Sequence, residues 1–408
     1  MRSLRRLTSY GLVAALLTFA VGCPHRSPVW SPDGEWIIVL GGAGGESVEH
    51  AASQLWLVAA SGTTRRRVPP PEDGVRFLAA TWIDARRFVA MTGTWDDDTV
   101  LEGSGKTWTR GVEDDAWTRV DLPAPSEERT PRRLPVVLGR DDDRWLAYAS
   151  GFESVTVASL KTTKVIRTLS PAEIVGPAAD GGLLITRPDD ASASSVLIAL
   201  DDALEPRWSV DFPTLRDTFA ARLGKKPVEI VFNDTSTSHL PLGGPAPGTN
   251  AAGAGATSAS TEWVGVTFTF SDVGWRDGVV GFYARLAAKD GAVLAVEHAI
   301  GLAGRPASIG AHAFALLAPQ PKRDLPLAIG RFAMAATLDG AGPVERFPVT
   351  AWKKEQVYGY SLSPDGRTLA VSIHDATSSL RFFATGHSDT GHSNTGRVLA
   401  VRFIALAD

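Results

Sequence analysis

Short apolar runs of strand length recur along most of this chain, and residues that favour turns separate them. The clearest run spans residues 29–39, and a second copy of its pattern spans residues 360–372. In both, a strand is followed by a Ser-Pro-Asp-Gly turn and a second strand. Proline presets φ, aspartate bonds the backbone ahead of it, and glycine takes a φ that a Cβ disfavours. We therefore assign structural turn roles to Ser31, Pro32, Asp33, Gly34, Ser363, Pro364, Asp365 and Gly366.

The first copy of this hairpin belongs to a longer unit. Two more apolar runs follow it, at residues 55–59 and 64–68, beyond a Gly-rich loop. Four strands in about forty residues is the size of one propeller blade. Weaker copies of the unit begin near residues 80, 136 and 177. The pattern predicts an all-β propeller over residues 29–408, with about seven four-stranded blades.

The repeat rhythm breaks at about residues 211–262, which we interpret as an insertion. Leu215, Phe219 and Leu223 are spaced four apart, which predicts a short helix over residues 213–223. That helix could cap the edge of the propeller or bind a partner. Residues 240–260 contain mostly Gly, Ala, Pro, Ser and Thr, which predicts a disordered loop.

The N-terminal segment has the pattern of an export signal. Residues 1–6 are basic, residues 7–21 are apolar, and small residues precede Cys23. The apolar run is shorter than a bilayer span, so it predicts a signal peptide over residues 1–22. Cys23 is the only cysteine of the chain, which excludes an internal disulfide and a multi-cysteine zinc site.

The segment ending at Cys23 resembles a bacterial lipobox, in which the cysteine is lipidated and becomes the mature N-terminus. The resemblance implies a signal peptide over residues 1–22, a lipidated tether over residues 23–28 and a membrane anchor. Pro24, where an aspartate would favour retention in the inner membrane, implies the outer membrane, facing the periplasm or the cell surface. The alternative is a plain secretory signal followed by an incidental cysteine.

The hairpins of residues 29–68 and 358–384 resemble the TolB-like, or WD40-like (PD40), propeller repeats of bacterial envelope proteins. This resemblance implies a propeller outside the cytoplasm, with loops available for binding. The named member of that family also has an N-terminal α/β domain, for which residues 1–29 leave no room. The partner of that member, a peptidoglycan-associated lipoprotein, is therefore not carried over to this chain.

The composition narrows the class of partner. Of the 408 residues, 44% are hydrophobic and 21% are charged, which is typical of a globular protein with a sizeable core. The formal net charge is −4. A nucleic-acid-binding protein would carry a basic stripe, so we expect no nucleic-acid partner.

Several short motifs suggest chemistry, and each has a plainer interpretation. The run Gly103-Ser104-Gly105-Lys106-Thr107 resembles the end of a P-loop, but Val100 stands where the first glycine is required. The aspartates at 96–98 and 141–143 could bind Ca²⁺, but they lack the spacing of a calcium loop. We interpret all three as polar loops or turns.

Two histidines and a possible nucleophile have plainer interpretations as well. His387 and His392 lie in a tandem repeat that could bind a transition metal or form a flexible hairpin loop. The run from Gly359 to Ser363 lacks the second glycine of a nucleophile elbow. We therefore expect no catalytic residue, no metal and no cofactor.

Four tryptophans gather in the second repeat. Packing between blades explains most aromatic residues of a propeller, whereas an exposed tryptophan would mark a binding surface. Trp95, beside an aspartate run, is the candidate binding residue; the others are Trp82, Trp108 and Trp117.

The sequence favours a non-enzymatic scaffold lipoprotein that binds a protein or a cell-wall component. A propeller hydrolase or lyase with an axial site is the first alternative, since fold does not fix function. An envelope sensor, in which residues 240–260 order on binding, is the second.

Overall fold

The structure is a computed structural model, and it describes twenty ranges of the chain. These are residues 28–41, 54–96, 99–101, 103–125, 135–139, 143–151, 154–178, 181–189, 194–223, 230–232, 263–272, 279–287, 289–300, 307–309, 312–317, 328–333, 345–348, 355–365, 367–375 and 398–405. Several sequence predictions fall outside these ranges: those for Cys23, Gly366, His387, His392 and residues 240–260.

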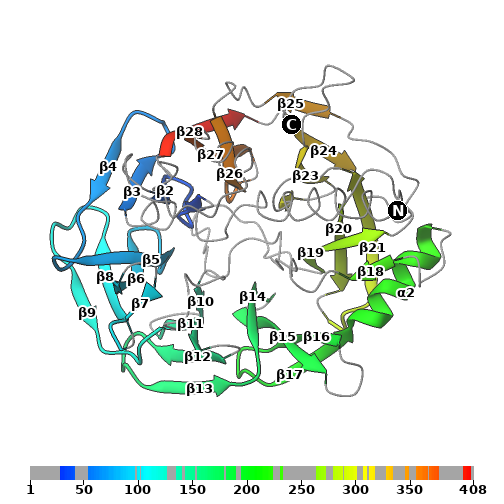
Figure 1. Cartoon of the computed structure of the whole chain (residues 1–408), viewed down its shortest axis with the longest axis horizontal. Coiled ribbons are helices and arrows are strands. Elements are labelled where there is room, and N and C mark those ends of the chain that lie inside the picture. The colour runs from blue at the N-terminus through cyan, green and yellow to red at the C-terminus, as the bar shows by residue number, and fades with distance from the viewer. Residues whose placement is uncertain are drawn as a thin grey trace, which may run out of the picture.

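Antiparallel sheets stand in a ring, each continuing the chain from its neighbour (Figure 1). The first sheet contains β1 (Val29–Trp30), β2 (Trp36–Gly41), β3 (Gln54–Ala59) and β4 (Arg65–Val68). The second contains β5 (Val75–Trp82), β6 (Arg87–Asp96), β7 (Thr99–Val100), β8 (Lys106–Gly111) and β9 (Thr118–Val120). Strands β4, β9, β13 and β17 lie at the periphery of the ring (Figure 1).

The next two sheets have the same simple order. They contain β10 (Val136–Leu138), β11 (Trp145–Gly151), β12 (Ser154–Ser159) and β13 (Val165–Leu169), then β14 (Glu173–Pro177), β15 (Leu183–Asp189), β16 (Ser194–Leu200) and β17 (Pro206–Asp211). In each, consecutive strands are hydrogen-bonded neighbours, as expected of propeller sheets.

The remaining sheets complete the ring. They contain β18 (Ile230–Phe232), β19 (Trp263–Asp272), β20 (Val279–Ala287) and β21 (Val293–Ile300); β22 (Ala307–Ile309), β23 (His312–Leu317), β24 (Ala328–Ala333) and β25 (Glu345–Pro348); and finally β26 (Glu355–Leu362), β27 (Thr368–Asp375) and β28 (Val398–Ala405). The chain is therefore an all-β propeller built on four-stranded sheets.

The predicted count of about seven four-stranded blades is wrong. Five sheets of the described residues have four strands, the second sheet has a fifth, and the last has three. The fifth strand exists because β6 is ten residues long and its end pairs with β7. A fourth strand of the last sheet was predicted near residues 380–384, outside the described residues.

The insertion also differs from the prediction. Helix α2 (Phe212–Leu223) follows β17, where the four-residue spacing predicted it, and Leu215 is buried. However, β18 lies inside the segment assigned to the insertion and pairs with β19 through Ile230 and Asp272. Part of that segment thus belongs to a sheet. Within the described ranges, no helix has the length and apolar character needed to cross a bilayer.

The first sheet is buried on both faces, which explains its continuous apolar runs. Residues 37–40 of β2 are all buried. Because side chains of a strand alternate between faces, Ile38 packs toward the second sheet, in a cluster with Phe77 and Phe88. Ile37 and Val39 point the other way and join Ala370 of the last sheet. The core is therefore a series of layers between neighbouring sheets.

Two tryptophan side chains connect neighbouring sheets by equivalent hydrogen bonds. Trp30 Nε1 donates to the carbonyl oxygen of Ser361 in the last sheet, at 3.1 Å. Trp82 Nε1 donates to the carbonyl oxygen of Val29 in the first sheet, at 2.8 Å. Trp30 also packs edge-on against Phe403, with ring centroids 6.0 Å apart. The sheet that begins the ring is thus bonded to the sheet that ends it.

Candidate functional site

The two Ser-Pro-Asp-Gly turns have the same hydrogen bonds. In the first, Ser31 Oγ donates to Asp33 Oδ1 at 2.5 Å and accepts from the Trp36 amide at 2.9 Å. In the second, Ser363 Oγ donates to Asp365 Oδ1 at 2.6 Å and accepts from the Thr368 amide at 2.9 Å. The serine hydroxyl thereby joins the aspartate to the start of the next strand.

In the second turn, these bonds favour the charged form of Asp365. The hydroxyl of Ser363 lowers the pKa of Asp365 and outweighs partial burial, which raises it, while the Arg367 amide lowers it further. Burial is the largest influence on Asp84 of the second sheet and raises its pKa. Bonds from Arg86 and Arg87 nevertheless bring that pKa below its usual value. These turns are structural elements and lie on one face of the ring.

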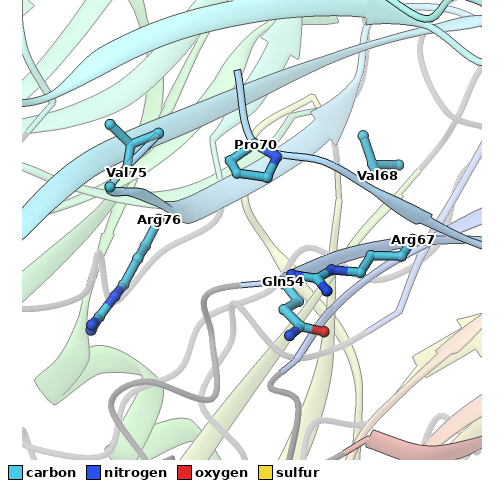
Figure 2. A pocket seen from close by; sticks show the side chains of 7 residues that line it. Gln54, Arg67, Val68, Pro70, Val75 and Arg76 are labelled. Atoms are coloured by element: carbon cyan, nitrogen blue, oxygen red, sulfur yellow. The ribbon is translucent and has the colours of Figure 1, made fainter. Parts of the chain in front are cut away.

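A pocket lies on the opposite face, between the first and second sheets. In the first sheet, β2 and β3 are antiparallel neighbours. Their pair Trp36 and Ala59 lies at the end near the Ser31 turn, and their pair Gly41 and Gln54 lies at the other end. Val68, paired with Leu55, is at that same end. The pocket, of about 210 Å³, is lined by Gln54, Arg67, Val68, Pro70, Gly74, Val75 and Arg76 (Figure 2).

The lining of the pocket is cationic at two points and apolar between them. Figure 2 shows Arg76 on one side of the pocket and Arg67 with Gln54 on the other. Among the residues that the structure describes, no aspartate or glutamate lines it. Glu72 lies on the same loop as Pro70 and Gly74, but Lys106 Nζ neutralises its carboxylate at 2.6 Å. The pocket therefore favours an anionic group.

Gln54 is the most unusual side chain of the pocket. It is only 6% exposed, and its Oε1 atom is buried without a hydrogen-bond partner among the described residues. A buried acceptor left unpaired costs about 1–3 kcal/mol.

Backbone pairing places Trp95 on the same face as the pocket. Thr94 of β6 pairs with Val75, which lines the pocket, and Trp95 follows it and pairs with Val100 of β7. Leu101, just after β7, is a hydrophobic side chain that is 41% exposed. We call the pocket together with residues 94–96 and 99–101 the pocket face.

The other tryptophans of the second repeat are packing residues, as their plainer interpretation predicted. Trp82 and Trp108 are buried, and Trp108 Nε1 donates to the hydroxyl of Thr92 at 3.0 Å. Trp117 packs against Phe77 and Phe88, with centroids 5.7 and 5.5 Å apart.

The P-loop resemblance does not describe a nucleotide site. Lys106 and Thr107 begin strand β8, whereas a P-loop lysine and threonine begin a helix. Ser104 Oγ accepts from the Thr94 amide at 3.0 Å, so this hydroxyl stabilises the loop.

The aspartate runs lie only partly within the described residues. Asp143 Oδ1 accepts from Ser159, and its Oδ2 accepts from Trp145 Nε1. The bond from Trp145 and then the one from Ser159 lower the pKa of Asp143. Among the described residues, no three histidine, cysteine or acidic side chains gather as a metal site would require.

Sequence reasoning did not find Gln54, Arg67 or Arg76. The sequence did contain a signal for a charged site in the run Arg65-Arg66-Arg67, because three consecutive positive charges on a short strand suggest a role beyond solubility. Only the fold separates their roles: Arg65 stacks on Trp56 at 4.2 Å, and Arg66 donates to the Val112 carbonyl. Arg67 alone of the three lines the pocket.

Comparisons with known proteins concern the fold. No protein-family model matches the sequence, and no curated protein matches it. A chain in the crystal structure of the mitotic checkpoint complex is similar over 86% of this chain and 87% of its own, with 12% identity and a TM-score of 0.48. The C-terminal WD40 domain of Sif2 is similar over 86% of this chain and 93% of its own, with 12% identity and a TM-score of 0.43. The sheet topology by itself defines the class of protein as a β-propeller.

Proposed function

We propose that this propeller is a binding scaffold of the bacterial cell envelope, which holds another protein on its pocket face. The observation that carries the proposal is the pocket between the first and second sheets, which two arginines line. Propeller sheets pack into a stiff ring, so a binding face on them is pre-organised, which lowers the cost of association.

The ring closure supports a pre-organised face. The hydrogen bonds of Trp30 and Trp82 join the first sheet to both of its neighbours, and one of those neighbours forms the other wall of the pocket. The two walls therefore keep a fixed separation. The exposed Leu101, directly after β7, extends the same face beyond the pocket, which gives a protein partner more surface than the pocket alone offers.

The anchor belongs to the same proposal. The apolar run before Cys23 and the resemblance to a lipobox support lipidation at that residue, and Pro24 supports sorting to the outer membrane. Several acyl chains would hold the protein on a bilayer stably, whereas a single chain is marginal. The hairpin repeats support membership of the TolB-like group of envelope propellers.

Two measurements test this function. First, the full chain and Cys23→Ala are produced in a Gram-negative host, labelled with radioactive palmitate and separated into membrane and soluble fractions. We expect label and membrane association only with Cys23; equal label in both would overturn the anchor.

Second, a photo-crosslinking amino acid replaces Leu101 on the pocket face or Ala85 in a turn on the opposite face. We expect a discrete protein adduct in intact cells from position 101 and none from position 85. The same adducts from both positions, or none from either, would overturn the assignment of the binding face.

A further inference from the structure

We propose that β13, the outer strand of the third sheet, binds an extended acidic segment of another protein as an added strand. The site lies at the periphery of the ring (Figure 1), in a different sheet from the pocket face. It therefore goes beyond the proposed function and does not depend on it.

The first observation is the position of β13 at the edge of its sheet. Within the described residues, β13 is paired with β12 alone. The other edge of such a strand presents backbone N–H and C=O groups with which an extended segment can pair. Ile166 forms a bulge between the pairs Val157–Arg167 and Ala158–Val165. Because a bulge bends the strand, it restricts pairing to a short segment that fits this edge.

The second observation is a pair of exposed apolar side chains on that edge. Val165 is 45% exposed and Ile166 is 43% exposed. Edge strands usually avoid pairing with other chains by carrying charged residues or proline. Three other outer strands of the ring have such residues at exposed positions: Arg65 and Arg67 in β4, Arg119 in β9, and Pro206 in β17. At Val165 and Ile166, β13 instead offers apolar surface that a partner strand can cover.

The third observation is the charge beside the apolar pair, which selects an acidic partner. Lys161 and Lys164 are exposed in the turn that leads into β13. Arg167, further along the strand, pairs with Glu205 at 2.8 Å. Opposite charges on directly opposed residues of two strands stabilise their pairing. We therefore expect an aspartate or glutamate of the partner opposite Lys164.

The same charges argue against a second copy of this chain as the partner. Two copies of β13, paired antiparallel about Val165 and Ile166, would place Lys164 of one copy opposite Arg167 of the other. Like charges directly opposite each other destabilise a strand pair. The charges therefore favour a different protein with an acidic segment.

A turn in another sheet provides the control. The Thr163 amide donates to the Ser159 carbonyl oxygen at 3.0 Å, and the Gly291 amide donates to the Ala287 carbonyl oxygen at 2.9 Å. The turn before β21 thus has the same hydrogen bond as the turn before β13. Lys289 is exposed in that turn. Lys289→Gln therefore removes a comparable charge far along the chain from β13.

The test is hydrogen exchange followed by mass spectrometry on the full chain in mild detergent, with three defined peptides. The acidic peptide is acetyl-Thr-Val-Glu-Val-Glu-Val-Thr amide. The basic peptide has lysine in place of both glutamates, and the proline peptide has proline in place of the central valine. We expect only the acidic peptide to slow exchange of the backbone amides of residues 164–169, because proline cannot continue a paired strand.

Substitutions in β13 separate the contributions of charge and apolar contact. Fluorescence anisotropy of the labelled acidic peptide measures the affinity. We expect Lys164→Gln to weaken binding about two- to fivefold. Ile166→Thr keeps a β-branched side chain and should weaken binding about threefold. Lys289→Gln should leave the affinity unchanged.

Four outcomes would overturn the inference: no slowing by the acidic peptide, equal slowing by the basic peptide, slowing by the proline peptide, or unchanged affinity in both β13 variants. Slow exchange of β13 that rises with protein concentration, without peptide, would make a second copy the partner and would also overturn it. Crosslinking at Leu101 tests the proposed function separately, so neither result decides the other.

Discussion

Gly34 lies against Pro364, so the turn of the first sheet touches the turn of the last. A Cβ built on Gly34 would stand 3.5 Å from Pro364 Cδ, and Gly34 has a φ of +73°. The two most similar stretches of the sequence are therefore neighbours in space, at the point where the ring closes. Trp30 strengthens the same junction through its bond to Ser361.

Replacing Trp30 by phenylalanine tests the strength of this closure. The change removes the Nε1–H donor and leaves the Ser361 carbonyl without that bond. We expect the free energy of unfolding to fall by about 1–2 kcal/mol, as measured by denaturant unfolding of the full chain. Trp82→Phe removes the equivalent bond to Val29 and should cost a similar amount.

Trp56 provides the control for this series. Its Nε1 atom is buried without a hydrogen-bond partner among the described residues, although the ring stacks on Arg65. Trp56→Phe therefore loses no hydrogen bond and should cost clearly less than Trp30→Phe. Equal losses at both positions would mean that ring size, and not the indole bond, stabilises the closure.

The turn at Asp365 should make stability depend on pH. The pKa of Asp365 is depressed, first by the Ser363 hydroxyl, so the charged form is the one that the folded state favours. This contribution is fully present above the unfolded pKa of about 3.9 and is lost as pH falls through the lower, folded value. We expect Asp365→Asn to cost about 0.5–1 kcal/mol at pH 7.

The measurement is urea unfolding of the full chain between pH 3 and pH 7. The gap between wild type and Asp365→Asn should shrink below about pH 4. Asp202→Asn, at an exposed turn position, serves as the control and should leave the curve unchanged. A gap that is constant over the whole range would contradict the assigned bond.

Gln54 should lower the stability of the folded chain. Gln54→Leu replaces a buried side chain, whose Oε1 atom has no partner among the described residues, by an apolar side chain of similar size. We expect the free energy of unfolding to rise by about 1 kcal/mol. Thermal unfolding of the full chain measures this change. A less stable Gln54→Leu protein would show that the oxygen has a partner in the folded chain.

Arg110 is a buried charge with incomplete pairing. Its side chain is 3% exposed, its Nε and Nη1 atoms have no partner among the described residues, and Asp115 lies 3.9 Å from Nη2. Burial and then the charge of Arg66 lower the pKa of Arg110, while Asp115 and Asp114 raise it. The side chain also stacks on Trp117 at 5.5 Å.

Two substitutions at Arg110 separate its charge from its packing. Arg110→Met keeps the contact with Trp117 and should be neutral or raise the free energy of unfolding by about 1 kcal/mol. Arg110→Ala removes that contact and should lower the free energy by about 2 kcal/mol. Denaturant unfolding measures both. A strongly destabilised Arg110→Met would mean that the guanidinium is fully paired.

Local patterns predicted the turns, the helix after residue 211 and the alternation of short strands, because these features depend on residues near each other in the chain. The turn at Ser31 needs only its own five-residue neighbourhood. The predicted strand count of the second sheet was wrong because the end of β6 folds back on β7, so Asp96 pairs with Thr99. The bounds of the insertion were wrong because β18 pairs with β19, about forty residues further along the chain, which local spacing does not reveal.

The sequence by itself determined that this chain is a repeated antiparallel β structure with an export-like N-terminal segment, since proline, glycine and apolar spacing act locally. Only the tertiary structure decided which residues form the pocket. Gln54, Arg67 and Arg76 belong to three strands of two sheets, and packing between those sheets brings them together. Burial makes the amide oxygen of Gln54 energetically costly, because an unpaired acceptor costs free energy only where water cannot reach it.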